Sequence, residues 1–594
     1  MAECAILDWN SDGAPSSHRF GDVYFSSEGG LEESRAVFLA GCGLPEAWRG
    51  RDCFTVGELG FGTGLNVLAL LDLWRRERPP GGRLCIFSVE AFPLSRQDAG
   101  RALGAWPELA DLAGPLLRRW PTAEGFHRID FPDLGASLDL AVMEAVEALE
   151  AWAGRADAWL LDGFSPARNP EMWRQEVLDL LARRSAPGAR AASYTVAGAV
   201  RRGLEAAGFK VERRPGFGRK SQRLEASFGA FEPPAGTVQP RIAIVGAGIA
   251  GASLARAFKA QGLAPVVIMD GGVAASGNPA ALVTPRLDAG GGATARLHAQ
   301  AFARAVALYE DEVPGAVIAR GALQLEAAER DGRRFDTVCV SPLLEPGALQ
   351  RLDAASAGER LGEARNAGGL WFTEGLVVEP APILQAWLDG CPRIMAEAAS
   401  VRRGPAGWEI LDPGGAVICA ADVVCLAGGY GSRRIRPELA LAPVRGQASF
   451  TKTGELAQAA AWGGYVIPTR DGVLFGATHD RGREDVAVIP DDHRRNLETL
   501  AQTRPELAAR LQKQRLQGRA ALRASTPDRG PIAGELEPGL IVLTGLGGRG
   551  FTLAPLLAEH LAATVLGAPS PLPAPLAATA ACRTFRTRQA HTRD

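Results

Sequence analysis

A glycine-rich segment deep inside the chain constrains the fold more than any other feature of the sequence. Ile242–Val245 reads as a short buried strand, and the residues from Ala252 onward read as a small-residue helix. Between them, Gly246, Gly248 and Gly251 make a G-x-G-x-x-G pattern. In such a turn the first glycine bends the chain, the second lets the backbone approach a pyrophosphate, and the third lets helix and strand pack closely. The segment therefore predicts a dinucleotide site that begins far from the start of the chain.

The next strand supplies an acidic partner for this site. Residues 265–269 form a second apolar run, which ends in Asp270. An acid at this spacing accepts hydrogen bonds from the adenosine ribose of a bound dinucleotide. Strand, turn, helix and terminal acid together are more specific than the glycines alone, which occur in many α/β turns. We expect this part of the chain to be an α/β domain that holds a dinucleotide.

Length and composition predict a multidomain protein without a bulk affinity for nucleic acid. A chain of 594 residues exceeds what one hydrophobic core can organise. Its apolar content of 46% and charged content of 22% are typical of soluble globular proteins. The net charge of −2 argues against coating of nucleic acid by charge alone and leaves local basic patches open.

Neither end of the chain reads as a targeting or membrane segment. The first twelve residues lack the basic and then apolar pattern of a secretory signal. The uncharged run 561–582 contains four prolines that disfavour a spanning helix, so we interpret residues 568–594 as a flexible Pro- and Arg-rich tail. The nine cysteines are scattered, which predicts neither a metal site nor a disulfide framework. We expect a cytoplasmic protein that does not enter membranes.

A second glycine-rich turn lies near the start of the chain. Residues 54–56 read as a strand and residues 65–76 as an amphipathic helix, with the turn between them and a further strand at 83–89. The turn resembles that of class I methyltransferases, where it passes under S-adenosylmethionine and an acid on the next strand binds the ribose. A plain glycine turn in a βαβ unit is the alternative. The residues expected to bind this cofactor are Glu58, Gly60, Gly62, Gly64 and Glu90.

An acidic residue also follows a later strand of this first part. An apolar run that begins at Ala156 stops at Asp162, and a loop containing two prolines follows. Because open α/β sheets bind ligands at the carboxyl ends of their strands, Asp162 is placed where a methyl acceptor would be held. A carboxylate there can hydrogen-bond an amine and take its proton. The alternative is that Asp162 caps the following loop or helix.

The first part of the chain resembles the methyltransferase half of the bifunctional tRNA 5-methylaminomethyl-2-thiouridine biosynthesis proteins. The resemblance runs through residues 216–220 and implies that Asp162 is catalytic. Where the family usually has Gly-Asp before this motif, the chain has Met143-Glu144, and Glu144 is expected to do the adenine-side work of that aspartate. The resemblance is carried by Trp9-Asn-Ser-Asp-Gly13, Asp22-Val-Tyr-Phe-Ser26, Gly30-Leu-Glu-Glu-Ser34, Gly60-Phe-Gly-Thr-Gly-Leu-Asn66 and Asp162-Gly-Phe-Ser-Pro-Ala-Arg-Asn-Pro170.

The densest basic stretch of this part lies between residues 201 and 223. A solvated charged face is the ordinary interpretation. Beside the tRNA modification site that the resemblance implies, contact with tRNA phosphates becomes the better one. Turn formers in residues 233–240 then predict a linker between domains. The residues expected to contact tRNA are Arg213, Arg214, Arg219 and Lys220.

The rest of the chain resembles flavoproteins of the D-amino-acid oxidase and glycine oxidase type, which implies that the dinucleotide is FAD. A small-residue loop at 275–285 matches the second half of the same bifunctional family and can lie beside a flat ring. A glycine segment before a helix expected at 553–566 can stabilise negative charge on the reduced ring. The family more often has Gly-Ser-Arg-Gly-Leu where this chain has Gly548 and Phe551, and its Arg-Gly-Gln, here 445–447, is expected near the flavin. The loop and strand-end residues expected at FAD are Ser276, Gly277, Asn278, Gly428, Gly429, Gly547, Gly548 and Gly550.

An amine substrate that carries a carboxylate needs an arginine in the flavin pocket. A planar guanidinium holds a carboxylate through two parallel hydrogen bonds. Arg523 and Arg549 are the candidates, and a surface or structural role is the alternative for each.

Together these features predict an α/β protein of two enzymatic parts. Residues 1–232 are expected to form a Rossmann-like methyltransferase, and residues 241–567 a FAD-binding Rossmann domain with an antiparallel-sheet substrate lobe. The resemblance implies that the second domain removes the carboxymethyl group of 5-carboxymethylaminomethyl-(2-thio)uridine in tRNA and that the first methylates the freed amine. A small-molecule amine oxidase fused to an unrelated methyltransferase, and a tRNA-binding scaffold with inactive sites, are the alternatives. We expect a monomer.

Overall fold

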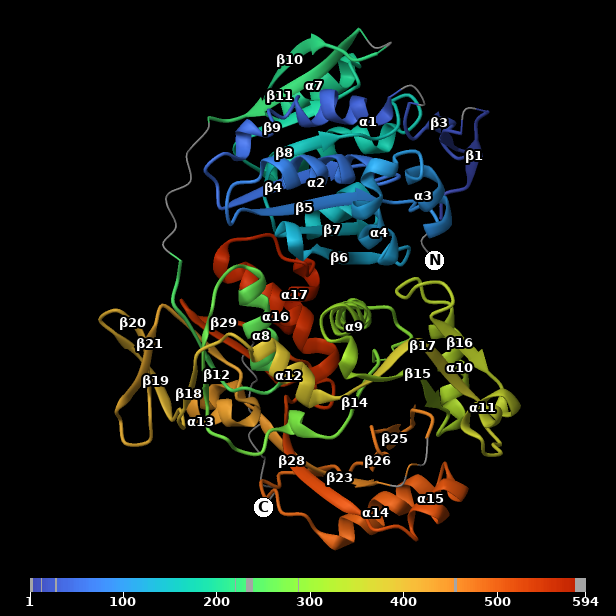
Figure 1. Ribbon diagram of the computed structural model, residues 1–594, viewed down its shortest axis with the longest axis vertical. Helices are drawn as coiled ribbons and strands as arrows, with labels where there is room; N and C mark the ends of the chain where they lie inside the picture. The colour runs from blue at the N-terminus through green and yellow to red at the C-terminus, as the bar shows by residue number, and fades with distance from the viewer. Residues whose placement is uncertain are drawn as a thin grey trace, which may run out of the picture. The chain divides into compact units, whose positions relative to one another are not determined.

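The computed structural model describes residues 4–11, 13–26, 29–218, 221–230, 239–286, 288–452, 454 and 457–582 of the chain (Figure 1). It divides into two compact units. Unit 1 takes its described residues from Met1–Val238, Pro342–Pro346 and Gly567–Ala574. Unit 2 takes its described residues from Gln239–Ser341, Gly347–Leu566 and Pro575–Asp594.

Unit 1 is built on an eight-stranded sheet, whose strands follow one another from top to bottom of this unit in Figure 1 in the order β10-β11-β9-β8-β4-β5-β7-β6. The five central strands pair in parallel, and β6, β10 and β11 pair antiparallel with their neighbours. The carboxyl ends of the parallel strands therefore meet at one edge. The strands are β4 (Cys53–Leu59), β5 (Arg83–Glu90), β6 (Gly125–Phe131), β7 (Ala136–Val142), β8 (Ala156–Leu161), β9 (Ser185–Ser193), β10 (Phe209–Pro215) and β11 (Gln222–Phe228).

Both faces of this sheet are covered, as the nearly continuous burial of β4 requires. Trp48 and Trp74 belong to one apolar core. Phe87 and Trp152, whose stacked rings are 4.3 Å apart, belong to a second. A small antiparallel sheet of β1 (Leu7–Trp9), β2 (Pro15–Ser17) and β3 (Asp22–Val23) precedes the large one. The helices are α1 (Gly30–Glu33), α2 (Leu65–Glu77), α3 (Arg96–Leu103), α4 (Ala110–Arg118), α5 (Ala145–Ala151), α6 (Gln175–Arg183) and α7 (Gly198–Ala206).

Unit 2 begins with a six-stranded sheet in the order β18-β13-β12-β22-β30-β29, parallel except for β29. A Cβ added to Gly251 would lie 1.8 Å from the carbonyl oxygen of Gly246, so only glycine lets helix α8 lie this close to the turn. The strands are β12 (Ile242–Val245), β13 (Val266–Met269), β18 (Arg393–Met395), β22 (Val423–Leu426), β29 (Ile532–Glu537) and β30 (Leu540–Thr544). The helices packed around this sheet include α8 (Ile249–Ala260), α9 (Ala293–Glu312), α12 (Pro380–Leu388) and α16 (Gly550–Leu566).

A ten-stranded sheet forms the second layer of unit 2, and most of its pairs are antiparallel. Helix α14 lies beside its strand β23 (Figure 1). The strands are β14 (Ala281–Val283), β15 (Val317–Leu325), β16 (Leu349–Leu352), β17 (Gly369–Val378), β23 (Ala442–Thr451), β24 (Ala460–Ala461), β25 (Tyr465–Pro468), β26 (Val473–Gly476), β27 (Asp480–Arg481) and β28 (Gln517–Ser525). A separate three-stranded sheet contains β19 (Ser400–Gly404), β20 (Gly407–Leu411) and β21 (Val417–Ala421). The remaining helices are α10 (Glu329–Cys339), α11 (Ala354–Leu361), α13 (Ser432–Ile435), α14 (Pro490–Ala501), α15 (Pro505–Leu511) and α17 (Ala574–Ala580).

The expected α/β class, with two sheets of Rossmann type and an antiparallel lobe, is confirmed. Two details at the end of the chain differ from expectation. Helix α16 begins at Gly550 rather than at residue 553. The prediction of a flexible tail is wrong for residues 568–582, because helix α17 forms there and Leu572 and Leu576 are buried. Pro575 lies in the first turn of α17, where the missing amide hydrogen costs little.

Parts of two expected segments, residues 233–238 of the linker and 583–594 of the tail, lie outside the described residues. Among the helices that the structure describes, none has both the length and the apolar character needed to cross a membrane.

A buried ion pair between α9 and α16 offers a test of this packing. Arg304 donates to both carboxylate oxygens of Glu559, at 2.8 and 2.5 Å, and both side chains are almost fully buried. In Glu559→Ala the guanidinium stays buried without this carboxylate, which costs about 3–5 kcal/mol. We expect the midpoint of thermal unfolding, followed by circular dichroism, to fall by several degrees. The matched variant Glu498→Ala breaks the exposed pair with Arg494 and should leave the midpoint nearly unchanged; equal effects would contradict the interpretation.

Candidate functional site

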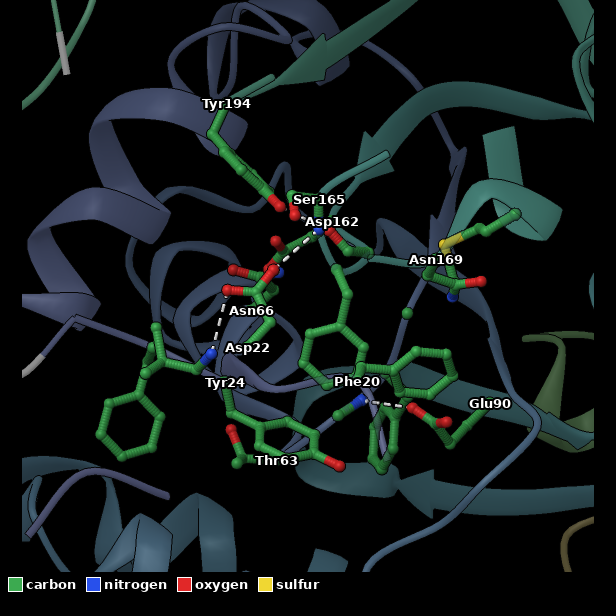
Figure 2. Close-up of a pocket in the computed structure, with 18 of the residues that line it drawn as sticks. Phe20, Asp22, Tyr24, Thr63, Asn66, Glu90, Asp162, Ser165, Asn169 and Tyr194 are labelled. Atoms are coloured by element: carbon green, nitrogen blue, oxygen red, sulfur yellow. Dashed lines mark hydrogen bonds between the residues drawn. The ribbon is translucent and has the colours of Figure 1, made fainter. Parts of the chain in front are cut away.

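A cavity of about 880 Å³ opens at the carboxyl ends of the parallel strands of unit 1 (Figure 2). Its walls come from the glycine-rich turn after β4, the ends of β5 and β7, the loop after β8 and the segment before α1. Residues far apart in the sequence therefore meet at one place. The expected site residues that line the cavity are Gly60, Gly62, Glu90, Glu144 and Asp162.

The glycines of this turn are required by its geometry. Gly60 has φ 88°, and an added Cβ would lie 1.9 Å from the carbonyl oxygen of Asp162. Gly62 has φ 53°, and a Cβ added to it would lie 3.1 Å from Cδ1 of the Tyr24 ring. A larger residue at Gly60 would push the turn away from the loop that carries Asp162. Gly64 does not line the cavity and instead begins α2 as its N-cap, with φ 79°.

Glu90 stands at the end of β5, where a ribose-binding acid is expected. One carboxylate oxygen accepts the amide hydrogen of Gly62 at 2.9 Å, and the other accepts that of Phe92 at 2.9 Å. Burial raises the pKa of Glu90 and the charge of Glu144 adds to this, while the backbone hydrogen bonds oppose it. Each oxygen of a carboxylate has two acceptor positions, so this anchoring leaves capacity for the hydroxyls of a ribose.

Asp162 is held by a side chain from another element. Asn66, buried in the first turn of α2, donates its amide hydrogen to Oδ2 of Asp162 at 2.7 Å (Figure 2). A donor of this kind fixes the orientation of the carboxylate. The next helical turn, η5 (Pro170–Trp173), has Asn169 at its N-cap position, so Asp162 caps no helix. The carboxylate is thus oriented at the wall of the cavity.

Glu58 lies beneath the turn instead of lining the cavity. The residue is fully buried, and its carboxyl group accepts a hydrogen bond from Ser88 Oγ at 2.5 Å. Burial raises the pKa of Glu58 to about 8, with Asp162 and Glu90 adding to the effect. The group is therefore mostly neutral at pH 7 and supports the turn from below.

Sequence patterns gave no role to three further residues of this cavity. Asp22 accepts the amide hydrogen of Ser165 at 2.9 Å and so ties the segment before α1 to the loop after Asp162. Tyr194 donates its hydroxyl hydrogen to the carbonyl oxygen of Gly163 at 2.7 Å. Burial raises the pKa of Tyr24 and of Tyr194. Asp22 and Tyr24 belong to one of the family-like segments, 22–26, which gave them no individual role, whereas Tyr194 lies in none of those segments and no sequence signal pointed to it.

The basic stretch of unit 1 is largely neutralised by its own carboxylates. Arg214 pairs with Glu212 at 2.7 Å, and Arg223 pairs with Glu225 at 2.6 Å. Arg213 is exposed and has no hydrogen bond or ion pair with the side chains that the structure describes. The other two candidates, Arg219 and Lys220, lie outside the described residues. The positive surface is smaller here than the count of arginines indicates.

Unit 2 contains a second cavity, of about 1170 Å³, at the carboxyl ends of its parallel strands. Gly246, with φ 109°, approaches the carbonyl oxygen of Ala427 so closely that an added Cβ would lie 2.6 Å away. Gly251 and Gly277 do not line the cavity. The expected site residues that do are Gly246, Gly248, Asp270, Ser276, Asn278, Gly428, Gly429, Arg523, Gly547, Gly548, Arg549 and Gly550.

The small-residue loop reinforces the first helix of unit 2. Ser276 Oγ accepts the amide hydrogen of Ile249 at 3.0 Å, at the N-terminus of α8. Asn278 Oδ1 accepts a hydrogen bond from Arg519 at 3.0 Å, and Gly277 leaves room for that guanidinium. The N-terminal amides of α8 and the glycine turn leave open backbone for a pyrophosphate, which fits a dinucleotide.

Two arginines in this cavity have different surroundings. Arg549 donates to the carbonyl oxygens of Thr284 and Pro285 at 3.0 and 3.2 Å, and burial lowers its pKa to about 10. The side chain of Arg523 is half-buried against Gly446 and has no hydrogen bond or ion pair with any residue that the structure describes. Arg549 therefore stabilises the loop at 284–285, whereas the guanidinium of Arg523 faces the cavity.

The Arg-Gly-Gln segment 445–447 was expected near the flavin, but none of its three residues lines this cavity. Arg445 is fully buried and donates to Asp492 at 2.7 Å and to Asp485 at 3.1 Å. Gln447 exchanges hydrogen bonds with the backbone of Ile489. The segment anchors residues 485–492 to β23 rather than touching a cofactor.

The two cavities define a protein class. Residues 107–228 match the family model of S-adenosyl-L-methionine-dependent methyltransferases, and residues 241–564 match that of FAD-dependent oxidoreductases. The chain is thus a methyltransferase joined to a flavin-dependent oxidoreductase, with S-adenosyl-L-methionine and FAD as the small molecules they use. The glycine turns and the acids at the carboxyl ends of β5 and β13, Glu90 and Asp270, line the cavities and fit the two molecules.

Comparison with whole proteins is more specific. The chain is 58% identical to the tRNA 5-methylaminomethyl-2-thiouridine biosynthesis bifunctional protein MnmC of Caulobacter vibrioides, over 96% of this chain and 95% of that one. It is 42% identical to the protein of the same name from Maricaulis maris, over 95% of this chain and 93% of that one. The chain belongs to the family of tRNA 5-methylaminomethyl-2-thiouridine biosynthesis bifunctional proteins.

The raised pKa of Glu58 predicts a pH effect on stability. The folded chain keeps this carboxyl protonated up to a pH of about 8, whereas the unfolded chain releases the proton near 4.5. The free energy of unfolding that Glu58 contributes is therefore fully present below pH 4.5 and is lost as the pH rises towards about 8. Glu58→Gln stays neutral, so its unfolding midpoint should rise relative to the unsubstituted chain between about pH 5 and 8, by a few degrees. The exposed Glu171→Gln is the control, and a difference that does not grow with pH would refute the assignment.

Proposed function

We propose that this chain modifies the wobble uridine of tRNA in two consecutive reactions. Unit 2 removes the carboxymethyl group of 5-carboxymethylaminomethyl-(2-thio)uridine, and unit 1 methylates the amine that results. In this proposal residues 1–232 are the methyltransferase domain and residues 241–567 the oxidoreductase domain. The observation that carries it is the pair of cavities with complementary chemistry. One presents an arginine whose side chain has no partner among the described residues, and the other presents an oriented carboxylate.

In unit 2, Arg523 holds the carboxylate of the substrate and aims its neighbouring carbon into the cavity. A guanidinium is suited to this because it binds both carboxylate oxygens in one plane. FAD held by the turn at Gly246 and Gly248 would supply the acceptor for the hydride that leaves the carbon between the amine and the carboxylate. The resulting imine adds water and separates into a primary amine, which stays on the nucleoside, and glyoxylate. The backbone amides at 547–550 surround the start of α16, where a helix N-terminus favours negative charge.

In unit 1, Asp162 acts on the amine released by the first reaction. An aliphatic amine has a pKa of about 10, so it is largely protonated at neutral pH and its lone pair is unavailable. Asp162 hydrogen-bonds this amine and takes the proton that is lost as the new nitrogen–carbon bond forms. Asn66 keeps the carboxylate aimed at the acceptor. Glu90 holds the ribose of S-adenosyl-L-methionine, which supplies the methyl group.

The proposal for unit 1 also includes contacts to tRNA phosphates. The residues proposed for these contacts are the exposed Arg213, together with Arg214, Arg219 and Lys220. Because Arg214 is already paired with Glu212, Arg213 carries most of the contact expected from the described residues.

Replacement of Asp162 tests the methylation step. Asp162→Asn keeps the size and the hydrogen-bonding capacity of the side chain but cannot take a proton. Loss of a positioned general base lowers the rate about 100-fold to 10,000-fold. Nucleoside mass spectrometry of tRNA from cells that contain only this variant should show the 5-aminomethyl form in place of the methylated one. Asp179→Asn, an exposed carboxylate of the same unit, should leave the methylated nucleoside in place. Build-up of the carboxymethyl form in Asp162→Asn would contradict the assignment of the two reactions.

Replacement of Arg523 tests recognition of the carboxylate. Hydrogen bonds to a charged group contribute about 1.5–3 kcal/mol, so Arg523→Gln should raise KM for the carboxymethylated tRNA about 10-fold to 100-fold. The flavin absorbance of the purified protein should persist, because the backbone and not this side chain shapes the dinucleotide turn. Arg523→Lys should recover part of the loss, since it restores the charge but not the planar fork. An unchanged KM in Arg523→Gln would show that another group binds the carboxylate.

A further inference from the structure

Two arginines, Arg523 and Arg529, line one rim of the unit 2 cavity, and Arg481 lies next to Arg523 in the sheet. We call Arg481, Arg523 and Arg529 the rim arginines. Arg481 of β27 and Arg523 of β28 both pair with Val444 of the strand between them. Directly paired residues of neighbouring strands place their side chains on the same face, so these two lie on one face with backbones about 10 Å apart. Arg529 follows β28 in a turn and lines the cavity together with Arg523.

A histidine between them reports how close the three charges are. His479 also lines the cavity. Its pKa is lowered first by burial and then by the positive charges of Arg523, Arg481 and Arg529, while Asp480 opposes the effect. All three guanidinium groups are therefore near enough to act on one imidazole.

No carboxylate among the described residues neutralises the rim arginines. None of the three has a hydrogen bond or an ion pair from its side chain to another described residue. The adjacent Asp480 is already bound by Arg495 at 2.8 Å and faces Arg445 at 3.6 Å. Three like charges held together repel one another, and an arrangement of this kind attracts anions.

Exposure separates the rim arginines into two kinds. Arg523 is half-buried in the cavity, whereas Arg481 and Arg529 are exposed. One substrate carboxylate satisfies Arg523 and leaves two exposed cations without an anion. A small amine substrate would carry nothing further to bind them, but a nucleotide within RNA carries a phosphodiester on either side of its base.

We propose that Arg481 and Arg529 form a phosphate-contact surface for the RNA backbone beside the target nucleotide. The inference rests on the proposed function, since it places the tRNA backbone at the rim while Arg523 binds the carboxylate on the base. Unit 2 therefore has its own RNA-binding surface, in addition to the one proposed for unit 1. The two exposed guanidinium groups are placed to contact backbone phosphates, and the half-buried guanidinium of Arg523 is placed to contact the modified base that enters the cavity.

The test compares one chemical group in two settings. The full-length protein carrying Arg481→Gln and Arg529→Gln is assayed with tRNA that contains 5-carboxymethylaminomethyl-2-thiouridine and with the free nucleoside. We expect the ratio of kcat/KM on tRNA to kcat/KM on nucleoside to fall about 10-fold or more. Each lost phosphate contact should also reduce the slope of log affinity against log salt by about 0.7–0.9, measured by fluorescence anisotropy with the same tRNA.

A matched control separates this effect from a general change of charge. Arg330→Gln with Arg333→Gln removes two exposed arginines from α10 of the same unit and should leave both the ratio and the salt slope unchanged. Equal losses on tRNA and nucleoside would overturn the proposal, because the residues would then act on the carboxylate or the cofactor. An unchanged ratio and slope would also overturn it. Absence of turnover of the carboxymethylated tRNA by the unsubstituted protein would instead refute the proposed function.

Discussion

The close approach of two backbone segments is the constraint on which the unit 1 site depends. The turn at Gly60 touches the carbonyl of Asp162 with no room for a single carbon atom between them. This contact joins the glycine-rich wall of the cavity to the loop that carries Asp162. Unit 2 uses the same solution, because Gly246 approaches Ala427 and Gly251 packs against the carbonyl of Gly246. Each small-molecule site thus depends on glycines that keep helix, turn and neighbouring strand together.

Around these contacts, charged side chains are sorted by burial. Glu58 is neutralised beneath the turn, Glu90 is pinned by two amides, and Asp162 is oriented by Asn66. Three carboxyl groups close together would repel one another if all were charged and free. The fold buries one of them, Glu58, behind the turn and places the other two, Glu90 and Asp162, at the wall of the cavity. The same principle distinguishes Arg549, which is fastened to carbonyl oxygens, from Arg523, which is not.

The sequence allowed the parts of the fold with strict spacing to be predicted. The strands before both glycine turns, the acids after the second strands and Asp162 after β8 all follow from local patterns that repeat at fixed distances. Residues positioned by tertiary contacts were beyond such patterns. Asn66 gains its role from a carboxylate that is 96 residues away in the chain, and Arg445 and Gln447 gain theirs from the segment around Asp492. The helix at 574–580 departs from the expectation because only one of the four prolines, Pro575, lies in it, and it stands in the first turn, where proline is tolerated.

The hydrogen bond from the Ser165 amide to Asp22 connects the segment before α1 to the loop that carries Asp162. The segment between β2 and α1 is therefore attached to the loop that carries Asp162. Tyr24 belongs to the same segment, and its ring lies against Gly62 of the glycine turn. Three walls of one cavity, which come from distant parts of the chain, are in this way joined to one another through one backbone hydrogen bond and one ring contact.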